Sequence, residues 1–432
     1  MEYLLFVAYL VLFAWLVTRV KFFRKTDLSN PQLIIIFLLK VMAGIFYGWI
    51  GLYYGGLAKM QDTWAFHAEG LQEYHLLFSN PDEYMTNLFR DSGNGGLAGL
   101  FGGADSYWND LKGNMLIKIL SVFDVFSFGY YYVNVIFYSF FTLFGAIGIY
   151  RVMNDVFPGK RPVILLAAFM VPSFLYWTSG LHKEGLIFTG LSLIIYSVYF
   201  GMKEKRWGWK RILAIVSGVL MLLIFRNFLL FILIPAVIGW VSAARWPRYG
   251  LVIFTSVYVF FGVLFFTARY INPALDFPQA VVNKQQQFID LKGGNSSIPI
   301  KQLEPNAVSF LKNTPQAINL STIRPYPSDV RHILSLAAAI EINALLLLFL
   351  LFIIWHKKAN PSRNTIYFFL FFSFSVLLAI GFSVNNLGAI VRYRSIIMPL
   401  LIVPMAASLD WNRLSRLFFS NIRNKNNIKK SG

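Results

Sequence analysis

Three side chains able to move a proton lie close together in the polar stretch Gly55 to Glu69, which directly follows a long apolar segment. They are Asp62, His67 and Glu69. Holding a carboxylate or an imidazole beside a membrane span costs free energy, so such residues call for a functional reason. Either group can act as a general base toward an attacking hydroxyl group. We therefore predict that Asp62 is a catalytic base assisted by His67 or Glu69, against the alternative that the stretch is only a solvated loop.

Basic side chains recur in short polar turns that we place on the same side of the membrane as this stretch. They are Lys183, Arg226, Arg392 and Arg394, and a longer loop adds Arg324. Short outer turns are usually depleted of lysine and arginine, so the cations kept there are candidates for ligand contacts. Arginine presents a planar fork of donors that suits phosphate, and lysine adds a point charge. We predict that these five residues bind the phosphate of a membrane-resident lipid, supported by His182, Glu184 and Tyr393.

Each cation also has a simpler interpretation, which the sequence leaves open. Lys183 can pair with Glu184 at a surface turn, and Arg226 can extend its side chain to the lipid headgroups. The two arginines of the Arg392-Tyr393-Arg394 triplet can bind lipid phosphate without specificity. Arg324 can simply hold its loop against the following span.

The composition indicates a polytopic membrane protein. Hydrophobic residues make up 57% of the 432 residues, aromatic residues 18% and charged residues only 14%. The apolar runs are continuous and about 17–25 residues long, which predicts helices rather than the short alternating strands of a barrel. The fold class expected is an all-α membrane protein, a polytopic bundle of about eleven transmembrane helices. The chain has no cysteine, which excludes disulfides and thiolate chemistry.

The placement of charge gives this bundle an orientation. The formal charge is +19, but the basic residues gather in short connectors and in the tail, which is typical of cytoplasmic loops rather than of nucleic-acid binding. We predict a single transmembrane domain over 1–410, a basic cytoplasmic tail over 411–432, and an N-terminus outside an inner, plasma membrane. Two long outer loops are expected, one at 56–113 that holds one or two short helices and one at 268–332. An interfacial amphipathic helix is expected over 114–128. The expected spans are 3–18, 33–55, 130–152, 163–178, 185–201, two short spans within 212–243 that meet at Arg226, 250–267, 333–355, 364–384 and 395–409.

Several short segments resemble the GT-C superfamily of polytopic glycosyltransferases, in particular the members that build bacterial envelope polysaccharides. The segments are KMQDTWAFH around Asp62, the hairpin PSFLYWTSGLHKEGLIF, IFRNFLLF, and the closing VRYRSIIMPLLIVP. The resemblance implies sugar transfer at the outer, periplasmic face, from a polyprenyl-phosphate or polyprenyl-diphosphate donor to a glycan, lipid or protein acceptor. The chain departs from the family in having an extra span before the first outer loop. Asp62 also lacks a second acidic residue in a paired motif, so a divalent metal cofactor has no support from the sequence.

Other functions remain as alternatives at this level. A polysaccharide polymerase or ligase of the same superfamily would use the same residues. A flippase or transporter of lipid-linked saccharides would line a path through the membrane centre with charges, whereas the main mid-span charges here are Lys40 and Glu341. A purely structural membrane subunit would leave the outer cations without a role.

Overall fold

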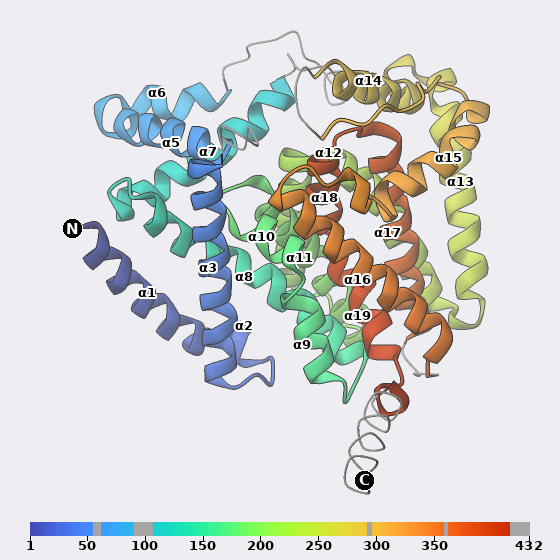
Figure 1. Ribbon diagram of the computed structural model, residues 1–432, viewed down its shortest axis with the longest axis horizontal. Helices are drawn as coiled ribbons and strands as arrows, with labels where there is room; N and C mark the ends of the chain where they lie inside the picture. Colours follow the sequence, from blue (N-terminus) through green and yellow to red (C-terminus); the bar gives the residue numbers. More distant parts are fainter. Residues whose placement is uncertain (55–61, 90–106, 292–295, 358–361, 415–432) are drawn as a thin grey trace, which may run out of the picture.

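The computed structural model describes residues 1–54, 62–89, 107–291, 296–357 and 362–414. These residues form helices throughout, joined by short turns and by two isolated β-bridges, Ser297 with Asn386 and His356 with Leu409. The first part of the Gly55–Glu69 stretch and most of the basic tail lie outside the described residues. We call the end of the molecule that carries α5, α6 and α14 the upper end, and the end where the described part of the chain finishes, after α19, the lower end (Figure 1).

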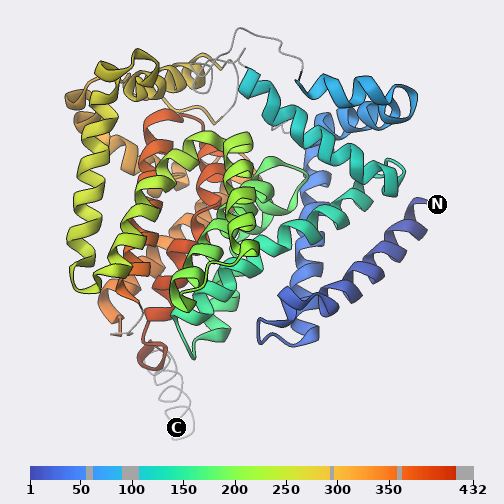
Figure 2. The same ribbon diagram turned by 180° about the vertical axis from the view of Figure 1, so that it is seen from behind.

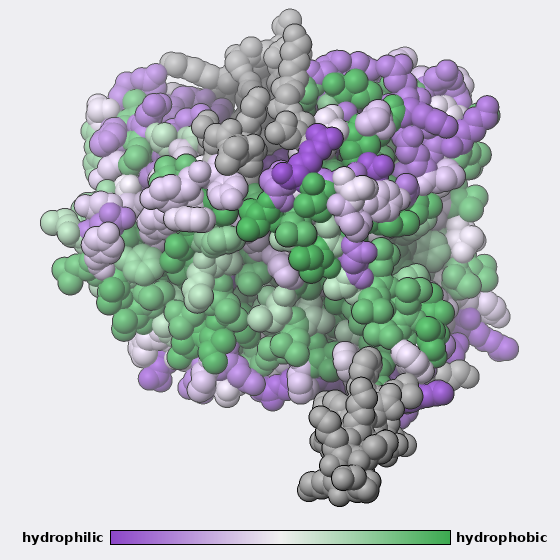
Figure 3. Space-filling model, viewed as in Figure 1, coloured by the Kyte–Doolittle hydropathy of each residue, from purple (hydrophilic) through white to green (hydrophobic). Residues whose placement is uncertain are grey.

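Eight of the described helices are long and apolar enough to cross a membrane, and two bent helix pairs raise the number to as many as ten. The eight are α1 (Glu2–Arg19), α3 (Asn30–Tyr53), α8 (Tyr131–Val156), α11 (Lys183–Glu204), α12 (Trp209–Arg245), α13 (Gly250–Ile271, extended by the turn from Pro247), α16 (Ile333–Trp355) and α17 (Arg363–Ser383). Helices α1 and α13 lie at opposite flanks of the bundle (Figures 1 and 2). A hydrophobic belt separates two hydrophilic rims on the surface (Figure 3). The chain is thus a multi-pass membrane protein.

Two of the expected straight spans are bent pairs instead. The span expected at 163–178 consists of α9 (Arg161–Phe169) and α10 (Pro172–Ser179), which meet at 55°. Val171 is extended because proline disfavours the helical conformation of the residue before it. The span expected at 395–409 belongs to α18 (Leu387–Ser395) and α19 (Met398–Ser408), which meet at 65°. The turn expected before it is therefore helical, and the side chain of Asn386 caps its first turn.

Helix α12 doubles back on itself at Arg226. Gly218, in its first half, lies against Ile194 of α11, and Trp240, in its second half, stacks on Tyr199 of the same helix. In one straight helix, residues 218 and 240 would be about 33 Å apart, whereas Ile194 and Tyr199 are only about 8 Å apart along α11. Arg226 is the residue where the helical path breaks, with φ −160° and ψ 74°. This reversal carries the Arg226 side chain to the upper end.

Small residues let the central helices α8 and α11 approach closely. A Cβ at Gly145 would meet Thr189, and a Cβ at Gly148 would meet the Ser192 hydroxyl. That hydroxyl donates a hydrogen bond to the carbonyl of Gly145 at 2.7 Å. Close packing of this kind is what holds helices together in a bilayer, where apolar burial between helices gives little driving force. The pair α8 and α11 forms the buried centre of the bundle.

The upper end carries a layer of helices built from the two long loops. The first loop contributes α5 (Asp62–Ser79), α6 (Pro81–Thr86) and α7 (Tyr107–Ser127), and the second contributes α14 (Phe277–Asp290) and α15 (Ala307–Thr322). Helix α5 is longer than the short helices expected there. The segment expected as an interfacial helix over 114–128 is the larger, C-terminal part of α7, and α7 packs against α5 and α8. Gln285 ties the second loop to α17 by donating to the carbonyl of Phe382 at 2.9 Å.

Candidate functional site

Charged side chains from four separate segments converge at the upper end of the bundle. Asp62 begins α5, and Arg226 lies at the reversal in α12. His182 lies in the turn between α10 and α11, Lys183 and Glu184 begin α11, and α18 carries Arg392 and Tyr393. We call these seven residues the charged cluster.

Glu184 is the centre of the charged cluster. Its side chain is fully buried, and Oε1 accepts a hydrogen bond from Nη2 of Arg226 at 2.8 Å. Nε of Arg392 lies 3.4 Å from the same oxygen, and Oε2 contacts Nδ1 of His182. A buried carboxylate is tolerated only when such partners compensate its lost hydration. Glu184 therefore holds the side chains of Arg226, Arg392 and His182 in place.

This contact determines how the imidazole of His182 is oriented. An ionised carboxylate only accepts hydrogen bonds, so Nδ1 of His182 carries the hydrogen and donates it to Glu184. The other ring nitrogen, Nε2, lies 3.8 Å from Oδ2 of Asp62. The hydroxyl of Tyr138 on α8 donates to the carbonyl of His182 and holds the backbone. With Nδ1 engaged by Glu184, Nε2 is the ring nitrogen that faces Asp62 and is left to exchange a proton.

Asp62 is the exposed member of the charged cluster, with 59% of its side chain accessible. Its Oδ2 lies 3.6 Å from Nη1 of Arg392. Contact with His182, followed by the positive charges of Arg392 and Lys183, holds the pKa of Asp62 below its usual value, against the opposing effect of partial burial. Asp62 is thus an ionised carboxylate that faces solvent at the edge of the charged cluster.

Aromatic rings frame the three cations. The guanidinium carbon of Arg226 lies 4.2 Å from the centre of the Tyr393 ring. That of Arg392 lies 5.2 Å from the same ring and 5.7 Å from the ring of Trp177. Nζ of Lys183 lies 4.9 Å from the Phe66 ring. Ring faces stabilise cations that have lost part of their hydration, without neutralising their charge.

The arginines keep donors that the protein itself does not use. The side chain of Arg226 is only 10% exposed. Its Nη1 atom is buried and nevertheless makes no hydrogen bond with any described residue. A buried donor without an acceptor is costly in a folded protein. An anionic oxygen supplied by a ligand would satisfy it. Within the described residues, no group of three histidine, aspartate or glutamate side chains is arranged to hold a metal ion.

Two of the predicted phosphate-binding arginines do not join the charged cluster. Arg394 is 1% exposed and donates to the carbonyls of Ser321 and Arg324, at 3.3 and 2.5 Å. It therefore caps the carbonyl end of α15, where a cation is favourable. The side chain of Arg324 lies 3.6 Å from Asp329 and stays with its own loop. The sequence placed Arg394 beside Arg392, but a helix points residues two positions apart in different directions.

His67 and Glu69 also lie away from the charged cluster. His67 is buried edge-on against the rings of Trp64 and Tyr131. It follows Asp62 by five residues, which is about 140° around a helix, so it faces the opposite side of α5. Burial lowers the pKa of His67 to about 4, against a hydrogen bond at the backbone of Gly129. Glu69 is exposed, and it is about 10 Å further along α5 than Asp62.

Sequence reasoning missed several residues that hold the site. Thr63 donates to the carbonyl of Leu181 at 3.2 Å and shares a hydrogen bond with Tyr131 at 2.8 Å. Trp177, Tyr138 and Tyr47 lie within apolar runs, where the sequence pattern gives no reason to separate them from ordinary packing residues. Only Thr63 could have been found from the sequence, because it is a polar residue directly after Asp62.

We found no protein-family model, curated protein or solved structure that matches the chain.

Proposed function

We propose that this protein is an integral membrane glycosyltransferase of the GT-C type, which transfers sugar from a polyprenyl-phosphate or polyprenyl-diphosphate carrier at the outer face. The observation that carries the proposal is the charged cluster. Segments far apart in the sequence bring three cations, an exposed carboxylate and an oriented histidine to one point at the upper end of the bundle. We infer that this end lies at the membrane boundary, where a lipid-linked sugar phosphate has its reactive bond.

The topology proposed for this function has eleven spans and an outer N-terminus. Eight helices, the two bent pairs and the reversal in α12 would supply those spans, with the upper end outside. The described connectors at the lower end are basic, with residues such as Arg161, Lys203 and Arg248. This distribution supports a cytoplasmic lower end.

In the proposed reaction, Arg226, Arg392 and Lys183 bind the phosphate of the donor. The unused Nη1 of Arg226 would donate to a phosphate oxygen, and the charge of all three would stabilise the phosphate as it departs. Cations fixed in advance by Glu184 and Tyr393 cost no reorganisation when negative charge develops.

The acceptor hydroxyl would lose its proton to this protein. Its oxygen attacks the anomeric carbon of the donor sugar, and the bond from that carbon to the phosphate oxygen breaks with its electron pair going to the phosphate. The hydroxyl proton passes to Nε2 of His182, while Asp62 stabilises the imidazolium that forms. This assignment moves the base from the α5 residues that the sequence favoured to the turn before α11.

A polymerase or ligase that uses a preassembled oligosaccharide would need the same geometry, and the protein can belong to either kind. Flippase activity has less support. A flippase is expected to line a central path with charged residues. The main mid-span charges are Lys40 and Glu341, and each contacts one end of α10.

Four substitutions test the proposal: Asp62→Asn, Lys183→Ala, Arg226→Ala and Arg392→Ala. A matched control is Lys312→Ala, which removes an exposed cation of α15 outside the charged cluster. Each variant would be scored for surface glycan in cells at equal protein level. Purified protein would be scored for thermal stabilisation by added undecaprenyl monophosphate.

We expect the three cation variants to lose the thermal stabilisation by undecaprenyl monophosphate. Their rate of glycan transfer should fall about 10²–10³-fold. Asp62→Asn should keep the stabilisation but lose transfer, and the control should retain both. Wild-type glycan from all four variants would end the enzyme proposal. Reporter fusions that place the loop around Asp62 in the cytosol would overturn the orientation.

A further inference from the structure

The two buried charged residues that the sequence placed in the middle of spans contact the two ends of the same short helix. Glu341 of α16 accepts a hydrogen bond from the backbone N–H of Ser173, in the first turn of α10, at 2.6 Å. Lys40 of α3 donates to the carbonyl of Thr178, in the last turn of α10, at 2.6 Å. An acceptor at the amino end and a donor at the carbonyl end satisfy the backbone groups that a helix leaves free, and both complement its dipole.

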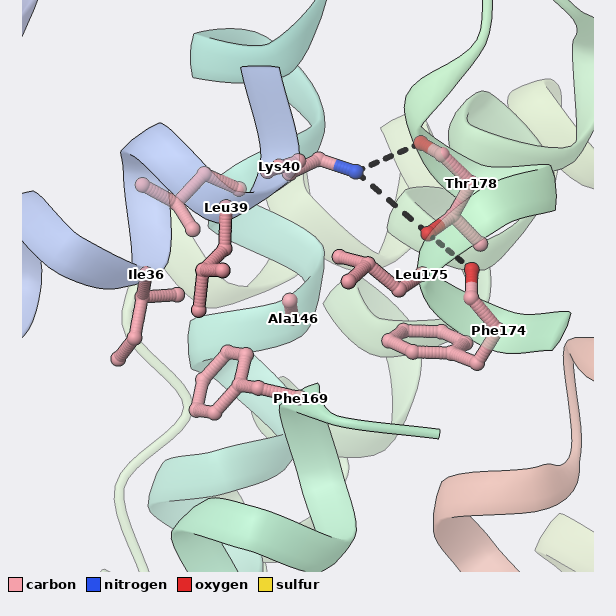
Figure 4. Close-up of a pocket in the computed structure, with 9 residues that line it drawn as sticks. Ile36, Leu39, Lys40, Ala146, Phe169, Phe174, Leu175 and Thr178 are labelled. Atoms are coloured by element: carbon pink, nitrogen blue, oxygen red, sulfur yellow. Dashed lines mark hydrogen bonds between the residues drawn. The ribbon is translucent and has the colours of Figure 1, made fainter. Parts of the chain in front are cut away.

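The surroundings of Lys40 leave no room for a ligand. The cavity beside it measures about 10 Å³, close to the lower limit for a single water molecule. Leu39, Phe169 and Leu175 are among the apolar side chains that line it (Figure 4). Nζ reaches out of this apolar lining toward Thr178 (Figure 4) and lies 3.3 Å from the hydroxyl of Ser179. Lys40 is therefore engaged with the end of α10 and not with a transport path.

The end of α10 leads directly into the charged cluster. Three carbonyls, one in the last turn of α10 and two in the turn that follows, accept hydrogen bonds from three different helices. Thr178 accepts from Lys40, Leu181 from Thr63 and His182 from Tyr138. Between them, Gly180 lies so close to the ring of Tyr47 that no Cβ would fit. The position of His182 thus depends on where α10 ends.

We propose that Lys40 is a positioning residue for the reaction, acting together with Glu341. The two residues fix α10 along its axis, and α10 sets the turn that orients His182 against Glu184 and directs Nε2 toward Asp62. The reaction-related part of this inference rests on the proposed function, whereas the geometric part does not. Lys40 itself touches neither donor nor acceptor.

The test uses Lys40→Met, which keeps the length of the side chain and removes the donor. Leu39→Ala is the matched control, because it removes packing from the same cavity without touching the turn. A second pair tests the other end of α10. Glu341→Gln keeps an acceptor for the Ser173 N–H, and Glu341→Leu removes it. This pair carries the test if Lys40→Met does not yield folded protein.

Two measurements apply to all four variants. The first is transfer kinetics with an undecaprenyl-linked sugar donor. The second is the nuclear magnetic resonance signal of the Nδ1 proton of His182 in histidine-labelled protein. The chain has only 5 histidines, and the signal is assigned as the one that disappears in His182→Gln.

We expect Lys40→Met and Glu341→Leu to lower kcat about 10²-fold, the cost of a misplacement near 1 Å, with a smaller change in KM. Both should displace the His182 signal, and both controls should leave kcat within about threefold of wild type. A wild-type signal and kcat in Lys40→Met and Glu341→Leu would overturn the inference. If the wild-type protein shows no transfer activity, the proposed function is refuted. If the His182 signal still moves in Lys40→Met and Glu341→Leu, the positioning of His182 by α10 is supported all the same.

Discussion

The carboxylate of Glu184 and the guanidinium of Arg226 come from two different helices and meet through a hydrogen bond of 2.8 Å. The bond joins the first turn of α11 to the reversal in α12, and Arg392 of α18 lies against the same carboxylate oxygen. One buried anion therefore holds two cations that would otherwise repel each other. This arrangement makes Glu184 the residue on which the charged cluster depends.

The first prediction concerns Glu184→Gln, which keeps the shape of the side chain and removes its charge. The two arginines and His182 would lose their shared anion, and breaking a buried pair of this kind costs about 3–5 kcal/mol. We expect a lower unfolding temperature in detergent and loss of transfer activity. Glu69→Gln is the control, because Glu69 is exposed and outside the charged cluster. Equal unfolding temperatures for the two variants would contradict this account.

The second prediction is that lysine does not replace Arg226. Nη2 of Arg226 binds Glu184, while Nη1 is left for a ligand, and a single ammonium group cannot serve both positions. Arg226→Lys should keep most of the stability and lose about 10²-fold in transfer rate. Arg248→Lys, at the exposed lower end, should behave as wild type. Full activity of Arg226→Lys would show that the fork has no role in binding.

The third prediction is that His67 makes the folded protein less stable as the pH is lowered. In the folded protein the pKa of His67 is about 4, against 6.5 when unfolded. Below pH 6.5 the unfolded chain therefore gains a proton that the folded protein does not accept until about pH 4. The free energy of unfolding should fall by about 3 kcal/mol over this window. His67→Phe should remove that slope in thermal unfolding measured from pH 7 to 4, and transfer activity should survive. A variant without activity would return His67 to the catalytic candidates.

The fourth prediction concerns Asp124, which is buried in α7 and accepts from the Asn134 amide at 2.6 Å. Burial raises the pKa of Asp124 from 3.8 to about 6, against the hydrogen bonds from Asn134 and Ser127. The folded protein keeps this proton up to about pH 6, whereas the unfolded chain loses it near pH 3.8. The free energy of unfolding should therefore fall as pH rises through that window, by up to about 3 kcal/mol. Asp124→Asn should remove this loss and raise the unfolding temperature at pH 7.5. A lower unfolding temperature at that pH would refute the assignment.

The fifth prediction concerns Gly180, in the turn before the charged cluster. A Cβ there would overlap the ring of Tyr47, so Gly180→Ala must displace the turn or the ring. We expect at least about a tenfold loss of transfer together with reduced stability. Gly262→Ala, where a Cβ meets no atom within 4 Å, is the control. That substitution should be neutral or stabilise by up to about 1 kcal/mol, because alanine favours helix.

Much of the fold could be predicted because crossing a membrane depends on local sequence. The apolar runs around Tyr131–Val156 and Arg363–Ser383 are long enough to span by themselves, and both are helices. The breaks within 163–178 and 395–409 were missed, although each contains a proline that ends or bends a helix. The sequence prediction for the outer loop was less accurate. It expected short helices where α5 runs for 18 residues, because its polar residues resemble those of a loop.

By itself, the sequence determined that this is a helical membrane protein and which polar residues had to be accounted for. It could not decide which of them meet, because a side chain's direction depends on the phase of its helix and on the packing of neighbouring helices. Asp62 and His67 are five residues apart and face opposite ways, whereas Asp62 and Arg392 are 330 residues apart and lie 3.6 Å from each other. Only the tertiary structure showed that Lys40 and Glu341 contact the two ends of one helix, since their bonding partners are backbone groups that every residue possesses.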